Sequence, residues 1–304
     1  MHMKRRRFLS FVSAACLTAA AAPASAFRWQ GVALGAKAQI VLDHPEAEPI
    51  AAAARAEIAR LEQIFSLYRP DSEIMRLNRN GRLEAPSFEM LECLTLARRI
   101  HEVTGGLFDP TVQPLWRLLA EAAAAGRIPE ASPLKAARAL VGFDRVGTEA
   151  GRITLAPGQA LTLNGIAQGF IADKVAALLA ARGVKDVLID TGEIVAMGAG
   201  RGHDGWPVTL RGEDRARLWR DRALASSATF GTVMDEAGHQ GHILAPEGSA
   251  QVPTEITISA KSAAMADGLS TALCLVANEA EARNLLRSVK QARLERFLQR
   301  AMPG

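Results

Sequence analysis

Asp267 and Thr271 lie four positions apart in SAKSAAMADGLSTALCL (259–275), a stretch otherwise dominated by Ala and Leu. This composition suits a helix that packs into a protein interior, and the i, i+4 spacing places both oxygen-bearing side chains on one helix face. A carboxylate beside a hydroxyl provides the hard oxygen ligands that Mg²⁺ prefers. The alternative, which this stretch alone leaves open, is a helix cap with its neighbour or a polar stripe on the surface.

Two further segments combine aromatic side chains with glycine or acidic residues. In YRPDSEI (68–74), Tyr68 is the only tyrosine of the chain and could stack on a planar ligand; the alternative is that Ser72 or Asp71 serves only as a helix cap. In GGLFDPT (105–111), the two glycines permit close approach of the backbone to a ligand, and Phe108 offers flat apolar surface. A helix C-terminus would explain the glycines but not the Phe-Asp-Pro-Thr sequence after them.

Three more segments could contribute to a site. LTLNGIAQGFIAD (161–173) places glycines at a strand-to-helix junction, where free backbone N–H groups suit an anion, but it lacks the spacing of a nucleotide-binding loop. DTGEI (190–194) is the acidic cluster in an otherwise buried pair of strands. GHQGHILAP (238–246) contains His242, a candidate general base, although a lone histidine is more often structural.

The elements that must position these residues are mixed helices and strands. Helical periodicity occurs in 47–68, 87–106, 114–125 and 165–183, and a further helix follows 255–260 directly. Strand patterns occur at 27–42, 143–147, 152–155, 160–163, 206–211 and 218–224, and 184–200 indicates two buried strands with a turn. Because regular β-α-β alternation is absent, the sequence predicts an α+β fold, with residues 27–304 forming one domain.

The N-terminus accounts for the basic charge of the chain. Residues 1–26 contain four basic residues and no acid, so their removal lowers the formal net charge from +4 to zero, and the sequence indicates no nucleic-acid partner. Arg5-Arg6-Arg7-Phe8-Leu9 matches a twin-arginine signal, and Ala24-Ser25-Ala26 ends it as a cleavage site would. We therefore expect export to the periplasm, with an uncleaved membrane anchor as the alternative, and we expect Cys93 and Cys274 to be isolated buried thiols.

Taken in order, YRPDSEI, GLFDPT, GIAQGF and ADGLST resemble the motifs of the ApbE family, the FAD:protein FMN transferases, over residues 31–276. The resemblance implies a T-fold-like α+β fold and Mg²⁺-dependent transfer of FMN from FAD to a Ser or Thr hydroxyl of an acceptor protein, with release of AMP. It implies that Asp267, Thr271 and the Gly165 carbonyl hold Mg²⁺ and that His242 is catalytic. The FAD contacts that it implies are Leu34, Tyr68, Leu107, Phe108, Asp109, Thr162, Gln168 and Ile243.

Three positions depart from the family pattern. Thr162 replaces an acid, Gln168 replaces a lysine that would touch FAD, and Ala245 replaces a further acid. The first two changes, with DTGE and the twin-arginine signal, resemble the NosX-type branch linked to nitrous-oxide reductase maturation, which implies a membrane-bound NosR-like acceptor. Two other functions use overlapping residues: a Mg²⁺-dependent FAD pyrophosphatase with water as acceptor, and a non-enzymatic flavin-binding chaperone.

Overall fold

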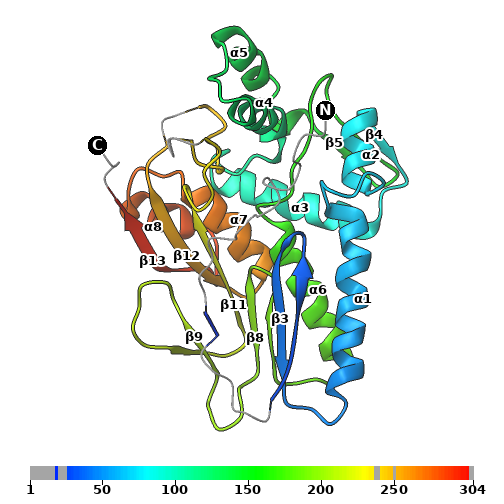
Figure 1. Cartoon of the computed structure of the whole chain (residues 1–304), viewed down its shortest axis with the longest axis vertical. Helices are drawn as coiled ribbons and strands as arrows, with labels where there is room; N and C mark the ends of the chain where they lie inside the picture. The colour runs from blue at the N-terminus through cyan, green and yellow to red at the C-terminus, as the bar shows by residue number, and fades with distance from the viewer. Residues whose placement is uncertain (1–17, 20–25, 236–239, 249–250, 301–304) are drawn as a thin grey trace.

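The computed structural model describes residues 18–19, 26–235, 240–248 and 251–300 (Figure 1). The predicted signal segment, 1–26, lies mostly outside these residues. Its described part includes the two-residue strand β1 (Thr18–Ala19), which pairs antiparallel with β9 (Trp206–Thr209). Within the described chain, none of the helices combines the length and the apolar character that crossing a membrane requires.

A seven-stranded antiparallel sheet forms the centre of the described structure. Its strand order is β13-β12-β11-β8-β7-β3-β2, so the C-terminal strand and the N-terminal hairpin occupy opposite edges. Two three-stranded sheets, β1-β9-β10 and β4-β6-β5, complete the strands, and the predicted α+β class is confirmed. The remaining bounds are β2 (Phe27–Ala33), β3 (Ala36–Leu42), β4 (Arg82–Glu84), β5 (Gly147–Glu149), β6 (Arg152–Thr154), β7 (Val187–Asp190), β8 (Ile194–Met197), β10 (Arg217–Trp219), β11 (Arg222–Ala228), β12 (Thr254–Ala260) and β13 (Arg293–Gln299).

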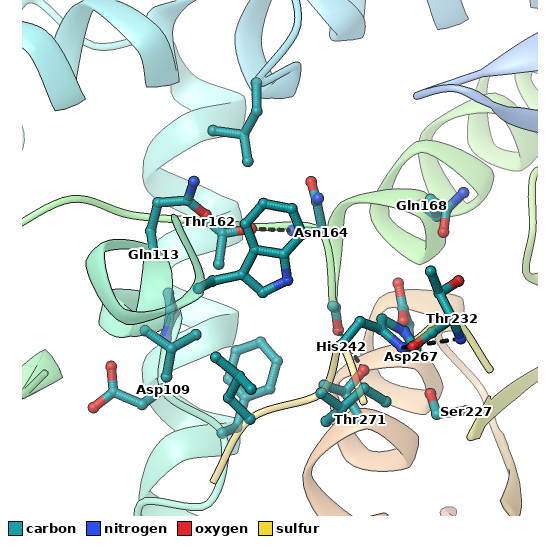
Figure 2. Close-up of a pocket in the computed structure, with 18 of the residues that line it drawn as sticks. Asp109, Gln113, Thr162, Asn164, Gln168, Ser227, Thr232, His242, Asp267 and Thr271 are labelled. Carbon is teal, nitrogen blue, oxygen red and sulfur yellow. Dashed lines mark hydrogen bonds between the residues drawn. The ribbon is translucent and has the colours of Figure 1, made fainter. Parts of the chain in front are cut away.

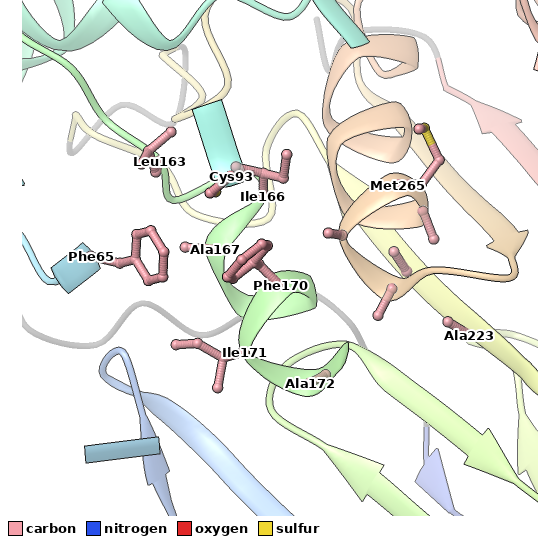
Figure 3. Close-up of a cluster of buried hydrophobic side chains, with 14 of the residues drawn as sticks. Phe65, Cys93, Leu163, Ile166, Ala167, Phe170, Ile171, Ala172, Ala223 and Met265 are labelled. Carbon is pink, nitrogen blue, oxygen red and sulfur yellow. The ribbon is translucent and has the colours of Figure 1, made fainter. Parts of the chain in front are cut away.

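Four helices make the main core with this sheet. They are α1 (Ala47–Phe65), α3 (Phe88–Val103), α6 (Ala167–Ala181) and α7 (Ala263–Leu273). Helix α7 packs on β11 and β12, and α6 packs between α1 and α7. Figure 3 shows the apolar side chains at this junction, where the Phe65 and Phe170 rings meet edge to face with centroids 5.4 Å apart. The predicted face of α1 is buried as expected, from Ile50 to Phe65.

The other helices lie around this core. They are α2 (Glu73–Asn80), α4 (Gln113–Ala124), α5 (Ala131–Ala139) and α8 (Glu279–Leu286), with the 3₁₀ turns η1 (Pro110–Val112) and η2 (Phe143–Arg145). Helices α4 and α5 stand together at one end of the molecule (Figure 1). Their apolar residues form a separate small cluster that includes Leu115, Ala137, Met234 and Leu244. This end of the molecule therefore has its own core beside the main one.

Several predicted strands differ from the structure because the chain turns inside them. The single strand expected over 27–42 is the hairpin of β2 and β3, because Leu34 and Gly35 adopt φ values of 48° and 84° and reverse the chain. The strand expected over 218–224 is divided between β10 and β11, with Asp221 at φ 50°. Residues 160–163 form no strand, and the segment expected over 143–147 begins with η2 instead. Cys93 and Cys274 are free and buried, as predicted.

Candidate functional site

One cavity of about 860 Å³ contains every site residue that the sequence predicts. Figure 2 shows the polar members Asp109, Thr162, Gln168, His242 and Asp267 around it. Segments that are far apart in the sequence thus meet at one place. The predicted residues that line it are Leu34, Tyr68, Leu107, Phe108, Asp109, Thr162, Gly165, Gln168, His242, Ile243, Asp267 and Thr271.

Helix α7 supplies the carboxylate and hydroxyl that the sequence singled out. Its N-terminus is capped by Ser262, whose Oγ accepts from the Met265 N–H. Asp173 of α6 accepts hydrogen bonds from Ser262, Ala263 and Ala264. Asp267 is therefore neither the cap of this helix nor part of a surface stripe, since it is only 3 % exposed. The cap alternative for Asp267 is excluded by these contacts.

The turn before α6 meets Asp267 and Thr271 directly. The Gly169 N–H donates to Asp267 Oδ2 at 3.0 Å, and Thr271 Oγ1 lies 3.4 Å from the Gly165 carbonyl oxygen. A Cβ at Gly169 would lie 2.4 Å from the Ala263 oxygen, so only glycine permits this approach of the two helices. The carboxylate, the hydroxyl and the carbonyl consequently lie in one group of oxygens.

Burial sets the electrostatics of this group. It raises the pKa of Asp267 to about 7, against the lowering effect of the Gly169 N–H. Burial likewise raises the pKa of Glu193 well above its usual range, and the neighbouring carboxylates of Asp267 and Asp190 raise it further. Glu193 is 4 % exposed and lines the same cavity. Two carboxyl groups thus share a dry region where their ionised forms repel each other.

The Phe108-Asp109 loop is held in place by its own hydrogen bonds. Asp109 Oδ1 accepts from the Thr111 N–H and hydroxyl, and Oδ2 accepts from the Phe143 N–H at 3.1 Å. His101 Nδ1 lies 2.8 Å from the Phe108 carbonyl oxygen. Both carboxylate oxygens of Asp109 are therefore committed to the chain itself, so this residue shapes the cavity wall.

Tyr68 lies beside the β2–β3 turn. A Cβ built on Gly35 would be 4.0 Å from its ring, and Leu34 is fixed in the turn by donating its N–H to Glu62 Oε1 at 2.8 Å. The tyrosine is 45 % exposed and also faces the cavity, so a flat ligand could cover its ring. Ser72 caps α2 by accepting from the Met75 N–H, as the alternative interpretation of this segment predicts.

Two of the three residues that depart from the family pattern, Thr162 and Gln168, connect neighbouring loops. Thr162 donates its backbone N–H to the Pro110 oxygen at 2.8 Å, and its Oγ1 accepts from the Asn164 N–H. The Gln168 side chain lies against Gly192, where an added Cβ would be 2.7 Å from Gln168 Nε2. Thr191 Oγ1 donates to the Gln168 carbonyl at 3.0 Å. These contacts join the turn before α6 to the loop of Asp109 on one side and to the β7–β8 turn on the other.

His242 is largely buried opposite α7. Its Nδ1 lies 3.0 Å from the Thr232 carbonyl oxygen and 3.3 Å from the Thr232 nitrogen. When Nδ1 carries the proton and donates to that carbonyl, Nε2 has the lone pair. Burial lowers the pKa of His242, although hydrogen bonds with the Thr232 and Thr229 backbone act in the opposite direction. The imidazole is therefore neutral at neutral pH, as a general base must be.

Other cavity residues carry no prediction from the sequence. Glu193 belongs to the DTGEI cluster, but no role follows from that cluster alone. Ser227 faces the cavity from β11, and its Oγ lies 2.7 Å from Ser270 Oγ, a pairing that depends on strand register and helix position. The further lining residues include Gln113, Ser226, Thr232 and Leu244.

The described residues contain no group of three or more His, Cys, Asp or Glu side chains arranged as a metal site. The oxygen group at α7 is of another kind, because it combines carboxylate, hydroxyl and backbone carbonyl. Such mixed oxygen sets are suited to Mg²⁺, which retains several of its waters. The donor chemistry of Asp267, Thr271 and Gly165 therefore fits this cation.

The chain is similar to proteins of one family over most of its length. The family model described as "ApbE family" matches residues 34–297. A FAD:protein FMN transferase of Vibrio cholerae is 28 % identical over 232 residues, covering 71 % of this chain and 70 % of that protein. One from Haemophilus influenzae is 29 % identical over 243 residues, covering 71 % and 69 %. The apo structure of a Pseudomonas stutzeri flavinyl transferase, 24 % identical, covers 91 % of this chain and 95 % of its own with a TM-score of 0.77.

Proposed function

Because the chain belongs to the ApbE family, we propose that it transfers FMN from FAD to a Ser or Thr hydroxyl of an acceptor protein, forming a phosphoester and releasing AMP. One observation carries the proposal: all the predicted flavin and cation residues line a single cavity that joins an apolar, aromatic wall to a group of oxygens. The relatives named as FAD:protein FMN transferases support the same activity.

The chain would hold Mg²⁺ through Asp267, Thr271 and the Gly165 carbonyl. A bound Mg²⁺ would neutralise charge on the pyrophosphate of FAD as the phosphoanhydride breaks. The protein contributes the positions of these oxygens, because Gly169 brings α6 against α7 and Asp173 fixes the start of α7. In the same cavity, Tyr68 and Phe108 provide apolar surface for a flavin ring.

His242 is the proposed general base. The acceptor hydroxyl forms a bond to the FMN phosphorus, the bond from that phosphorus to the bridging oxygen breaks, and AMP leaves with the electron pair. His242 accepts the hydroxyl proton on a ring nitrogen, for which its lowered pKa keeps a lone pair available. The Thr232 backbone holds the ring in position.

The acceptor is proposed to be a redox protein of the cell envelope. The twin-arginine pattern at Arg5-Arg6 supports export to the periplasm, and Thr162 and Gln168 resemble the NosX-type branch of the family. This combination favours a membrane-bound NosR-like acceptor and a role in nitrous-oxide reductase maturation.

The deciding experiment incubates the mature protein with FAD, Mg²⁺ and a candidate acceptor domain, and then measures the mass of the acceptor and the AMP released. The matched control is the same domain with its target hydroxyl residue changed to Ala. We expect FMN to be added to the first domain alone, with an equal amount of AMP. Free FMN and AMP without modification of the acceptor would identify a pyrophosphatase instead, and bound but intact FAD would identify a flavin-binding chaperone.

A further inference from the structure

Glu193 is a buried acid with no basic side chain among the groups that act on it electrostatically. It follows the turn between β7 and β8 and is 4 % exposed. Its Oε2 has no hydrogen-bond partner among the described residues. The groups that act on it electrostatically are the carboxylates of Asp267 and Asp190 and the Ser226 backbone, and no basic side chain is among them.

Two other acids near the cavity, the buried Asp109 and the partly buried Asp173, differ in this respect. Asp109 accepts three hydrogen bonds from its own loop and η2, and Asp173 accepts three at the start of α7. Their oxygens are therefore satisfied by the fold, and each has a structural task. Burying a carboxylate without a partner is unfavourable, so a protein keeps one chiefly where a ligand that is not part of the chain supplies the partner.

The position of Glu193 identifies the chemistry of that partner. It lines the same cavity as Asp267, both side chains are buried, and their ionised forms repel each other. An anionic ligand group placed between them would add a third negative charge. A cation would balance both, and the adjacent Thr271 hydroxyl and Gly165 carbonyl already provide oxygen ligands for one.

We propose that Glu193 is a further carboxylate of the Mg²⁺ site formed by Asp267, Thr271 and Gly165, and that it binds the cation directly or through one of its waters. The inference rests on the proposed function, because that function requires the cation. It adds a residue from the β7–β8 turn to ligands that come from α7 and the turn before α6. The Gln168 amide packed on Gly192 and the Thr191 hydroxyl bonded to the Gln168 carbonyl connect these segments.

The test measures how tightly Mn²⁺, a paramagnetic substitute for Mg²⁺, binds to the mature chain without FAD. The EPR signal of free Mn²⁺ gives the amount of ion that remains unbound. Four variants are compared with wild type: Glu193→Gln, Glu193→Asp, Asp267→Asn and Asp190→Asn. The last is the matched control, because Asp190 ends β7 three residues before Glu193, is also acidic and is not part of the cavity wall. Its Oδ1 accepts from the Gly192 N–H at 3.0 Å, and asparagine can retain this bond.

We expect Glu193→Gln to weaken Mn²⁺ binding roughly tenfold or more, Glu193→Asp to weaken it less, and Asp190→Asn to leave it within about twofold. Added Mg²⁺ should compete for the wild-type site. Unchanged binding by both Glu193 variants, with loss in Asp267→Asn, overturns the role of Glu193 and leaves the proposed function intact. Unchanged binding by every variant overturns the Mg²⁺ site itself and the role of Glu193 with it.

Thermal unfolding provides a second readout that is independent of activity. If Glu193 is a cation ligand, Glu193→Gln removes a carboxyl group whose ionised form the metal-free fold disfavours. The metal-free variant should therefore unfold at a higher temperature than wild type and gain less from Mg²⁺. A purely structural carboxylate would give the opposite result, with lower stability at every Mg²⁺ concentration. That outcome would also overturn the proposal.

Discussion

Acidic residues in and around the cavity divide by how their oxygens are satisfied. Asp109 and Asp173 are fully engaged by backbone and hydroxyl donors, so replacing either should chiefly change the fold. Asp267 accepts one hydrogen bond that the structure records, and Glu193 Oε2 accepts none among the described residues. The motifs of the sequence give a role to Asp267 and Asp109 but none to Asp173 or Glu193, whose hydrogen-bond partners come from segments distant in the chain.

Asp267→Asn tests the cation site through activity. Asparagine retains nearly the same volume and can still accept from the Gly169 N–H, but it lacks the charge that attracts Mg²⁺. We expect FMN transfer to fall by about a hundredfold or more and to recover partly at high Mg²⁺, because mass action offsets weaker binding. Thr271→Val, which lacks only the hydroxyl oxygen, should act in the same direction more mildly. Superimposable Mg²⁺ curves for all three proteins would contradict the assignment.

The pKa of His242, the proposed general base, predicts how the rate of FMN transfer changes at acidic pH. A general base acts when neutral, and burial lowers the pKa of this imidazole below its usual value of about 6.5. Transfer measured as kcat/KM should therefore decline only below about pH 6.5 in the wild type. His242→Gln should reduce the rate roughly 100-fold or more and abolish this decline. A decline that persists unchanged in the variant would assign it to another group.

The same shift affects stability with a defined sign. Since the unfolded chain binds the imidazole proton more readily than the folded chain does, this group destabilises the fold as pH falls below about 6.5 and has no effect well above it. The free energy of unfolding in urea should depend on pH differently in wild type and His242→Gln only below about pH 6.5. This measurement separates the effect of His242 on stability from its effect on catalysis.

Among the secondary-structure elements, the periodicity of apolar residues predicts most helices and several strands. The remaining elements depend on tertiary contacts that the local sequence does not show. Helices α1, α3, α4, α6 and α7 follow the predicted segments closely because their apolar faces repeat at helical spacing. The hairpin at Leu34-Gly35 and the break at Asp221 were missed because one or two residues with positive φ reverse the chain without interrupting the apolar pattern. The sequence predicts neither helices α5 and α8, which are short, nor strand β13, which lacks a buried face because its residues are all exposed or partly exposed.

Gly169 determines how closely α6 approaches α7. An added Cβ would lie 2.4 Å from the Ala263 oxygen and 2.7 Å from the Ala264 nitrogen, and backbone atoms cannot yield as a flexible side chain can. We expect Gly169→Ala to destabilise the protein by about 1–3 kcal/mol and to displace its N–H from Asp267, so that Mg²⁺ binding weakens as well. Gly151→Ala is the matched control, because its Cβ would meet nothing within 4 Å, and it should change stability by less than about 0.5 kcal/mol. Equal urea midpoints for both variants would show that the helices can separate without cost.

For the molecule as a whole, the family motifs in the sequence predict which residues form the site, and the structure shows which contacts bring them together. YRPDSEI, GLFDPT, GIAQGF and ADGLST converge on one cavity although the segments at 68 and 271 are far apart in sequence. Glu193 and Ser227 depended on the register of β8, β11 and β12, which local pattern does not fix. The seven-stranded sheet and the cavity are both built from residues at or beyond Phe27.

We expect the twin-arginine pattern to direct export of this protein. Strand β2 begins at Phe27, so cleavage after Ala26 would leave the seven-stranded sheet complete and would remove only β1 from the described strands. Arg5→Lys with Arg6→Lys should prevent the protein from appearing in the periplasmic fraction, because the twin-arginine pattern requires both guanidinium groups. Arg7→Lys, which makes the same change one position beyond the pair, should be exported normally. Immunoblots of the periplasmic and cytoplasmic fractions compare the three proteins, and N-terminal sequencing of the exported form should begin at Phe27. Equal export of the double variant, or an exported chain that begins at Met1, would show that a different signal directs this protein to the envelope.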